Sequence, residues 1–392
     1  MRIAILTSGI MPVPAVNGGA VENLIDFYLD YNDRHKLHDI TIYSLWNDDV
    51  ANHHALLSEV NHYKYINTNS KWYKVKKYLY KKLHKEKFYH YSVELYLDEV
   101  IKDIRSKLFD IIIIENRPGF ILYISKRIKS NFILHLHNDF LNKDTLNASE
   151  IVNSYLGVVC VSDFITNRVN QIKSNHKKCI TIHNAIDIHS FHQAEPIKRE
   201  SLGLNENDFV IVYSGRLTKE KGILQLIKAL KKTKMPQNLK LLIIGASGYG
   251  KDLYSNSFVK ELEEESTSIN DKVIFTGFVD YIKIPSHLKT ADIAVVPSMW
   301  DEPFGLTVVE AMAAGLPLIT TRSGGIPEIC EGVATIIERE NVVKNLANAI
   351  LDLYQHPKKR EAMSKASLER SKLFDKDTYA KNLFSAIEMS FS

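Results

Sequence analysis

The stretch Val296-Pro-Ser-Met-Trp-Asp-Glu-Pro-Phe-Gly-Leu-Thr-Val-Val-Glu-Ala-Met-Ala-Ala-Gly-Leu-Pro317 carries the most information about this chain. The apolar run Ile293 to Val296 leads into it and predicts a buried strand, followed by a loop that contains Glu302. A helix is expected to begin near Gly305 and to carry Glu310 about one turn inside it. Two carboxylates so placed suit a ligand rich in hydroxyl groups.

The backbone at the start of this helix suits an anion. The first N–H groups of a helix have no partner within it, and here they belong to Phe304, Gly305 and Leu306. A nucleotide-sugar offers both hydroxyls and phosphate, so it is the first ligand to consider. The alternative is structural: Glu302 caps the helix and Glu310 lies on its solvated face.

The same string, Glu-Pro-Phe-Gly-Leu-Thr-x-x-Glu-Ala-Met-Ala-x-Gly-x-Pro, resembles the signature of the retaining glycosyltransferases of the GT-B fold, specifically family 4. The resemblance implies that Glu302 holds the donor sugar through its hydroxyls. It implies that Glu310 accepts hydrogen bonds from the ribose of the donor. It also implies front-face attack, with the leaving phosphate taking the proton of the acceptor.

A second motif, Ser214-Gly-Arg-Leu-Thr-Lys-Glu-Lys-Gly222, follows a predicted strand and precedes an amphipathic helix over Ile223 to Lys232. A guanidinium and an ammonium, Arg216 and Lys221, would neutralise a diphosphate there without a metal ion. A solvated basic loop is the alternative. The motif resembles the family's pyrophosphate-binding element, which also assigns Gly215 to the donor site.

The first half of the chain has weaker motifs. Gly18 and Gly19 follow the first strand and precede a helix, where glycine lets backbone approach an oxyanion closely. By resemblance this loop touches the donor phosphate. His135-Leu-His-Asn-Asp139 resembles the family segment whose histidine faces the donor sugar; His137 matches best, although His135 lies on the same face of the strand.

Further donor contacts follow from resemblance to other family segments. His183-Asn-Ala-Ile-Asp187 reads as a hinge element that brings Asn184 near the donor. Gly245 opens a glycine-rich loop whose spacing is wrong for a dinucleotide fingerprint and which more plausibly lines the nucleotide pocket. Phe278 and Val279 lie in the segment that holds the base through backbone groups.

The composition describes a globular protein. The chain has 392 residues, 45% hydrophobic and 24% charged, with a net charge of +4, which favours two domains and gives no reason to expect nucleic acid as a partner. The three cysteines have no metal-ligand spacing, which favours reduced thiols in the cytoplasm. No signal peptide and no membrane span is expected.

Short apolar runs alternate with helical patterns, which is typical of βαβ units. The expected strands are Ile3–Leu6, Ile40–Tyr43, Ile111–Ile114, Phe132–Leu136, Val158–Val161 and Ile180–Ile182, then Phe209–Tyr213, Leu241–Ile244, Val273–Phe275, Ile293–Val296, Leu318–Thr320 and Thr335–Ile337. The prediction is an α/β protein of the GT-B class, with two doubly wound Rossmann-like domains facing a central cleft.

Three segments are assigned. Residues 1–188 form an acceptor-binding domain, and residues 189–372 form a nucleotide-sugar-binding domain, with the boundary sought within 189–208. By resemblance, residues 373–392 hold a C-terminal helix, expected over Lys376–Met389, that crosses back to pack on the N-terminal domain.

Residues 71–91 are rich in lysines and aromatic side chains. On a helical wheel Trp72, Val75, Leu79 and Leu83 line one face, and the opposite face carries Lys74, Lys77, Lys81 and Lys85. A basic amphipathic helix of this kind predicts contact with an anionic membrane. A core-packed helix with a solvated lysine face is the alternative.

Together the motifs predict a retaining, metal-independent hexosyltransferase-type enzyme. It would move a sugar from a nucleoside diphosphate donor, expected to be a UDP-sugar, to an acceptor hydroxyl on a glycan or lipid-linked molecule. No cofactor or metal is expected, because the single Asp-x-Asp, Asp375-Lys-Asp377, reads as a helix cap.

The expected setting is cell-surface polysaccharide or glycolipid synthesis, in the cytoplasm or peripherally on the inner face of the cell membrane. Two alternatives stay open: a nucleotide-sugar epimerase of GT-B fold, and a non-catalytic glycan- or lipid-binding partner. The string that carries Glu302 and Glu310 argues against the epimerase, and intact Arg216, Lys221, Glu302 and Glu310 argue against the non-catalytic partner.

Overall fold

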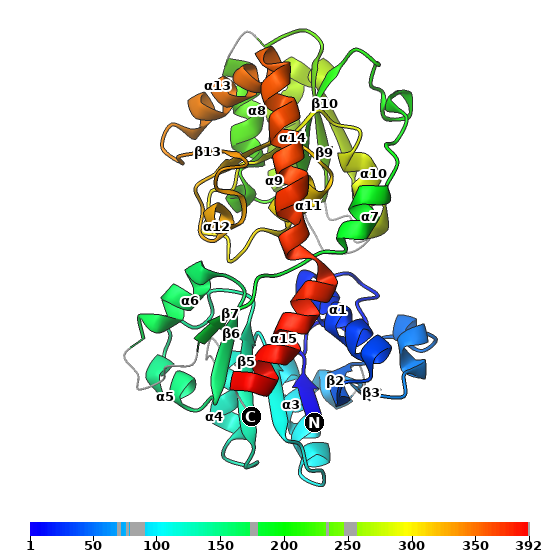
Figure 1. Ribbon diagram of the computed structural model, residues 1–392, viewed down its shortest axis with the longest axis vertical. Coiled ribbons are helices and arrows are strands. Elements are labelled where there is room, and N and C mark those ends of the chain that lie inside the picture. The colour runs from blue at the N-terminus through cyan, green and yellow to red at the C-terminus, as the bar shows by residue number, and fades with distance from the viewer. Residues whose placement is uncertain are drawn as a thin grey trace. The chain divides into compact units, whose positions relative to one another are not determined.

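A computed structural model describes residues 1–68, 72–75, 78, 91–172, 179–232, 235–246 and 257–390. The chain divides into two compact units (Figure 1). Unit 1 comprises Met1–His183 and Asp377–Ser392, and unit 2 comprises Asn184–Lys376. The sequence boundary was expected within 189–208, but α7 (Ile188–Gln193) already belongs to unit 2.

Unit 1 is built on a seven-stranded sheet in the order β3-β2-β1-β4-β5-β6-β7, in which all neighbouring strands are parallel. Its strands are β1 (Arg2–Leu6), β2 (Asp39–Leu45), β3 (Asn61–Ile66), β4 (Ile111–Glu115), β5 (Asn131–Leu136), β6 (Gly157–Cys160) and β7 (Cys179–Thr181). Its helices are α1 (Ala20–His35), α3 (Tyr91–Ile104), α4 (Ile121–Ile124), α5 (Ala148–Asn153), α6 (Asp163–Asn170) and α15 (Lys376–Ser390).

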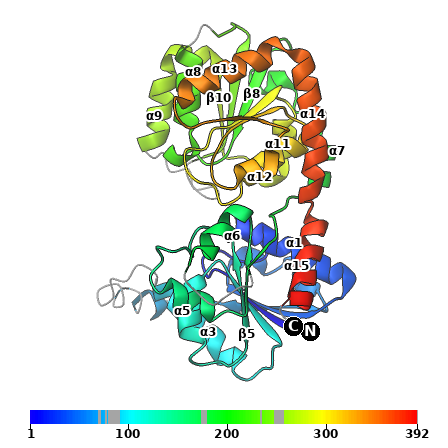
Figure 2. The ribbon, with the colours of Figure 1, turned by 60° about the vertical axis from the view of Figure 1, so that its left-hand side comes forward.

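Unit 2 repeats the plan with a six-stranded parallel sheet in the order β10-β9-β8-β11-β12-β13. Its strands are β8 (Phe209–Ser214), β9 (Leu239–Ile244), β10 (Val273–Gly277), β11 (Ile293–Val296), β12 (Leu318–Thr321) and β13 (Thr335–Ile337). Its other helices are α8 (Ile223–Lys232), α9 (Ser257–Ser266), α10 (Ile284–Leu288), α11 (Leu306–Ala313), α12 (Ile326–Cys330), α13 (Val342–Gln355) and α14 (Pro357–Ser371). Helices cover both faces of each sheet (Figure 2).

The strand order explains where sites can form. In both sheets the direction of winding reverses next to the first strand, between β1 and β4 in unit 1 and between β8 and β11 in unit 2. Ligands of such sheets bind beyond the carboxyl ends of the strands at this reversal. Glu115 ends β4, and the decisive stretch of sequence begins at Val296, the last residue of β11.

Every expected strand is confirmed, with ends shifted by a residue or two, and one strand was missed. The missed strand, β3, reads Asn-His-Tyr-Lys-Tyr-Ile and pairs only with β2 at the edge of its sheet. An edge strand needs no continuous apolar run, because one side of it is exposed to solvent. Central strands such as β4 are buried throughout and are therefore easy to recognise.

The C-terminal helix α15 packs on unit 1, as expected. It lies beside α1 in both views (Figures 1 and 2), and Arg34 of α1 donates to Asp377 at 3.0 Å. Phe384 packs edge-on against Tyr28, with ring centroids 6.0 Å apart. The second aspartate of the Asp-x-Asp motif therefore lies in the first turn of a helix, paired with an arginine.

Candidate active site

An ion pair joins the two motifs of unit 2, one over residues 214–222 and the other over residues 296–317. The Lys221 ammonium lies 2.6 Å from Oε1 of Glu302, and the Ser298 hydroxyl donates to the same oxygen at 2.8 Å. Lys221 ends the 3₁₀ turn Lys219–Lys221 before α8, and Glu302 follows β11. The Glu302 side chain is only 8% exposed, so this is a partly desolvated charge pair rather than a solvated surface contact.

Two glycines allow the loops that carry this pair to interlock. A Cβ at Gly222 would lie 1.8 Å from the carbonyl oxygen of Pro297, and one at Gly324 would lie 2.3 Å from the carbonyl oxygen of Glu302. Neither position has room for a side chain. The Met299 N–H also donates to the carbonyl of Glu220 at 2.8 Å, so the backbone itself sets the distance between the two charged groups.

The glycine-containing loop over residues 323–328 packs against the backbone of Glu302. The Gly325 N–H donates to the Glu302 carbonyl at 2.8 Å, and the buried Ser323 hydroxyl donates to the carbonyl of Ser298 at 2.8 Å. This loop therefore supports the backbone of Glu302 and fixes the place of its side chain.

Arg216 lies on the loop after β8, next to the loop after β9. Gly215 and Gly245 both have positive φ, and a Cβ at Gly245 would lie 2.0 Å from the Gly215 carbonyl oxygen. The Leu217 N–H donates to Ala246 at 3.0 Å, and Tyr213 donates to the Arg216 carbonyl at 2.8 Å. The Arg216 side chain is partly exposed, at the sheet edge where a ligand is expected.

The helix start was predicted correctly: α11 begins at Leu306 with Gly305 as its N-cap. Gly305 has φ of 118°, and no side chain caps this helix end. Gly305 and Leu306 are partly exposed, whereas Phe304 is buried and packs against Phe374 with ring centroids 5.8 Å apart. The N–H groups of this turn thus keep the capacity to bind an anion.

Glu310 is buried inside α11, which overturns the alternative of a solvated position. Its side chain accepts a hydrogen bond from Tyr281, at the start of the 3₁₀ turn Tyr281–Lys283. Burial raises the pKa of Glu310 to about 7, and the tyrosine opposes that rise. A buried carboxylate with one protein donor retains lone pairs for further hydrogen-bond donors.

The remaining unit 2 residues are placed as follows. Phe278 and Val279 follow β10, with Phe278 exposed, and the carbonyl of Gly277 accepts from Gly245 at 3.1 Å. This joins the expected base-binding segment to the Gly245 loop. Asn184 is buried in the expected hinge segment, and its Oδ1 finds no hydrogen-bond donor among the described residues.

In unit 1 the glycine turn before α1 is present, and the carboxyl group of Glu22 lies next to it. Gly19 is the N-cap of α1 with φ of 110°, and a Cβ there would lie 2.3 Å from Oε2 of Glu22. Burial raises the pKa of Glu22. A phosphate at Gly18 and Gly19 would therefore share the helix start with a carboxyl group that sequence reasoning did not consider.

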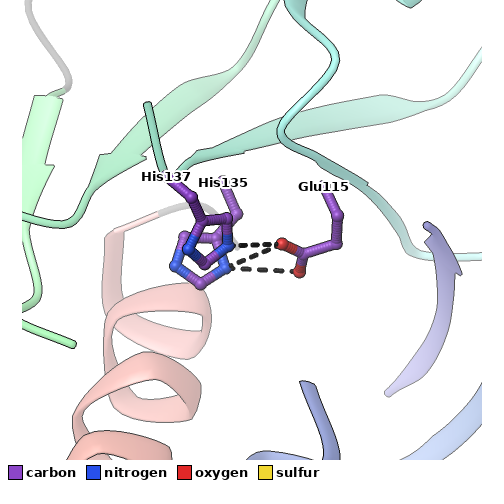
Figure 3. A group of neighbouring side chains, drawn as sticks. All are labelled: Glu115, His135 and His137. Carbon is purple, nitrogen blue, oxygen red and sulfur yellow. Dashed lines mark hydrogen bonds and ion pairs between the residues drawn. The ribbon is translucent and has the colours of Figure 1, made fainter. Parts of the chain in front are cut away.

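His135 and His137 form a buried cluster with Glu115 (Figure 3). His137 Nε2 lies 2.9 Å from Glu115 Oε2, and His135 Nδ1 lies 3.2 Å from Glu115 Oε1. The Tyr28 hydroxyl donates to the same carboxylate at 2.9 Å. Burial pushes the pKa of Glu115 upward, but the two histidines outweigh it and hold that pKa well below its usual range.

Sequence reasoning missed Glu115 and its tyrosine partner. The signal was present: Glu115 is the one charged residue ending the run Ile-Ile-Ile-Ile-Glu, and a charge ending a fully buried strand needs partners. A carboxylate and two imidazoles are also a metal-ligand set. Here one nitrogen of each imidazole faces the carboxylate oxygens at a hydrogen-bond distance, so the three side chains form a hydrogen-bonded cluster.

The basic segment 71–91 lies mostly outside the described residues, including Lys77, Lys81, Lys85, Leu79 and Leu83. Residues 72–75 are helical. Lys74 is exposed there, but so are Trp72 at 75% and Val75 at 53%. In this described part the two apolar side chains do not pack into a core. None of the described helices has the length and apolar character needed to cross a bilayer.

Comparison with known proteins agrees with the fold. The model of the family "Glycosyl transferases group 1" matches residues 194–370. Spore coat protein SA of Bacillus subtilis (strain 168) is 28% identical over 405 residues, covering 99% of both chains. The putative glycosyltransferase YtcC of the same organism is 27% identical, covering 89% of this chain and 82% of its own.

Solved structures share the fold across the whole chain. The Anabaena protein Alr3699/HepE, crystallised with UDP and glucose, superposes with a TM-score of 0.74 at 21% identity, covering 99% of both chains. Sucrose-phosphate synthase from Thermosynechococcus elongatus gives 0.78 at 19% identity, covering 100% of this chain and 99% of its own. These likenesses show that the chain has the GT-B fold.

Within this fold, unit 2 of the chain is similar to the glycosyl transferases group 1. Its matched segment, residues 194–370, contains Arg216, Lys221, Glu302 and Glu310. This match and the similarity to a putative glycosyltransferase favour a hexosyltransferase over an epimerase and over a non-catalytic binding partner.

Proposed function

We propose that this protein is a retaining, metal-independent glycosyltransferase of family 4 that moves a sugar from a UDP-sugar to an acceptor hydroxyl. The observation that carries the proposal is the Lys221–Glu302 pair, built between two interlocked loops beside Arg216 and the exposed start of α11. Those loops follow β8 and β11, where the winding of the sheet reverses and ligands are expected.

Each group then has a role that its environment supports. Arg216 and Lys221 bind the diphosphate and stabilise the charge that develops on the leaving group. Lys221 has three N–H donors, so it can keep its bond to Glu302 and still bind a phosphate oxygen. Glu302 binds the donor sugar through its hydroxyls.

The nucleoside part of the donor falls to other residues of unit 2. The lone pairs of Glu310 accept from the ribose hydroxyls, and the backbone of Phe278 and Val279 holds the base. From unit 1 we assign Gly18 and Gly19 to the phosphate and His137 to the donor sugar. The choice of uridine draws on the neighbour crystallised with UDP and glucose, whereas a relative from Corynebacterium glutamicum is named for GDP-mannose.

Because no cation is needed in this scheme, the first experiment is a transfer assay in EDTA. UDP-, GDP- and ADP-sugars are incubated with simple glycan acceptors, and nucleotide release and the anomeric configuration of the product are followed by NMR. The proposal predicts turnover of a UDP-sugar with the α or β configuration of the donor retained. Inversion, or turnover only after magnesium is added, would contradict it.

We further propose that the acceptor belongs to cell-surface polysaccharide or glycolipid synthesis and that the protein binds the inner face of the membrane. Exposed Trp72, Val75 and Tyr78 beside Lys74 support this, because an aromatic and basic surface favours anionic lipid. Sedimentation with phosphatidylglycerol vesicles should retain the protein, and Trp72→Ala should weaken retention. Equal binding to phosphatidylcholine vesicles would argue against attraction between the basic residues and anionic lipid.

A further inference from the structure

The buried cluster of Glu115, His135 and His137 has an unusual composition for the interior of a sheet. The side chains of Glu115 and His135 are fully buried, and that of His137 is 2% exposed. A charged carboxylate in such a place is costly unless its oxygens are satisfied. Here the Tyr28 hydroxyl and one nitrogen of each histidine satisfy it. Figure 3 shows the two histidine contacts.

The geometry decides which nitrogen of each ring carries a proton. Glu115 faces the Tyr28 hydroxyl and one nitrogen of each histidine, and an ionised carboxylate can only accept hydrogen bonds from them. The nitrogens that face it must therefore carry hydrogen: Nε2 in His137 and Nδ1 in His135. A hydrogen bond on one ring nitrogen thus sets the state of the other.

The rings are also fixed by packing. The imidazole centroids lie 4.1 Å apart, and the Tyr379 ring stacks near His135 at 6.3 Å. Tyr379 comes from α15 and also contacts the Tyr28 ring at 6.5 Å. The backbone of His137 is held as well, because its N–H donates to Asn116 Oδ1 at 3.1 Å. The last helix of the chain therefore forms one wall of this cluster.

We propose that Glu115 is a positioning residue for His137. It holds the imidazole in one orientation with hydrogen on Nε2, so that in the neutral ring Nδ1 is the hydrogen-bond acceptor. This inference rests on the proposed function in one respect, the assignment of His137 to the donor sugar. A carboxylate that orients a histidine in this way fixes the hydrogen-bonding pattern of the ring before a substrate binds.

The tautomer can be tested without any substrate. In protein labelled with ¹⁵N-histidine, two-bond ¹H–¹⁵N spectra report which ring nitrogen is protonated, and His137→Gln and His135→Gln assign the signals. The proposal predicts a protonated Nε2 in His137 and a protonated Nδ1 in His135 at pH 7.5. A bare Nε2 in His137 would overturn it, whether or not a sugar donor has been found.

Kinetics of Glu115→Gln, with Tyr28→Phe as matched control, test the positioning role. Glutamine keeps the shape, but its NH₂ group cannot accept from an imidazole, so kcat/KM should fall by about a hundredfold. Loss of the carboxylate charge should also move the acid limb of the pH profile to lower pH, because a nearby anion favours protonated histidine. Tyr28→Phe removes a donor to the same carboxylate and leaves the histidine contacts, so it should do neither.

A purely structural role predicts a different pattern. Glu115→Gln would then lower stability, and activity in the folded fraction would keep the wild-type pH profile. That outcome, or equal effects of Glu115→Gln and Tyr28→Phe on kcat/KM, would overturn the proposal. Absence of transfer by the wild-type protein with every donor tested would instead contradict the proposed function and leave the tautomer measurement as the test of Glu115.

Discussion

Two buried glutamates, one in each unit, show how differently the same side chain can be used. Glu115 in unit 1 accepts from three side chains, and its pKa is held well below the usual range. Glu310 in unit 2 is also buried, but among the described residues its side-chain donor is one tyrosine, and burial raises its pKa to about 7. The number of donors decides whether burial is overcome.

The two carboxylates differ in whether the protein itself supplies enough hydrogen-bond donors for their oxygens. Glu115 is satisfied within the protein and stabilises the structure around it. Glu310 has lone pairs to spare and is costly to keep ionised until more donors arrive. Ribose hydroxyls are such donors, which is why the proposed function places the donor nucleoside at Glu310.

The largest expected effect is on stability at Glu115. Glu115→Leu leaves two imidazoles and a tyrosine hydroxyl buried without their acceptor, so the free energy of unfolding should fall by about 3–5 kcal/mol. Urea denaturation at pH 7.5 would measure it. Tyr28→Phe, which removes one donor and no charge, should cost only about 1 kcal/mol. A loss below 1 kcal/mol for Glu115→Leu would show that the carboxylate is not needed.

Replacing Glu310 should raise the free energy of unfolding at high pH, whereas replacing Glu115 should lower it. Its native pKa of about 7 lies above the ordinary value of 4.5, so the native state binds more protons between those values and stability falls as pH rises through them. Glu310→Gln should therefore stabilise unit 2 at pH 8 by on the order of 3 kcal/mol, and hardly at pH 4. Thermal midpoints at the two pH values would measure this, with a rise of about 6–12 °C expected at pH 8. A destabilised variant at pH 8 would contradict the raised pKa.

The affinity for a nucleotide should depend on whether Glu310 is ionised. If ribose hydroxyls donate to ionised Glu310, affinity for UDP should weaken as pH falls below about 7, by up to about tenfold per pH unit. Calorimetric titrations between pH 5.5 and 8.5 would show it. Glu310→Gln should bind weakly with no such dependence. The same pH dependence in this variant would assign the titration to another group.

The smallest expected effect is at Tyr281, the side-chain donor to Glu310. Tyr281→Phe removes a hydrogen bond that lowers the pKa of Glu310, so it should cost about 1 kcal/mol at pH 8, where the carboxylate is ionised. At pH 5 the cost should be smaller. Thermal midpoints at both values would test this, and an equal loss at both would point to lost ring packing against Phe191 instead.

The sequence predicted the unit 2 site better than the unit 1 cluster. Glu302 and Lys221 lie in short motifs next to clear strands, so the carboxyl edge of a parallel sheet was enough to bring them together. Glu115, Tyr28 and Tyr379 come from a strand and two helices distant in sequence. The contacts of Tyr379 depend on the packing of α15 in unit 1. Local periodicity contains no information about which of these distant side chains meet. The edge strand β3 was missed for a related reason, since it lacks a buried run.

The most direct test of the central claim is calorimetric titration of UDP in EDTA with wild-type protein, Lys221→Ala and Lys219→Ala. Lys219 precedes the site by two residues, is 75% exposed and pairs with Glu261, so it is a matched control. The account predicts metal-indifferent binding that Lys221→Ala weakens by about ten- to a hundredfold and Lys219→Ala leaves unchanged. Binding that requires magnesium, or that survives Lys221→Ala intact, would contradict it.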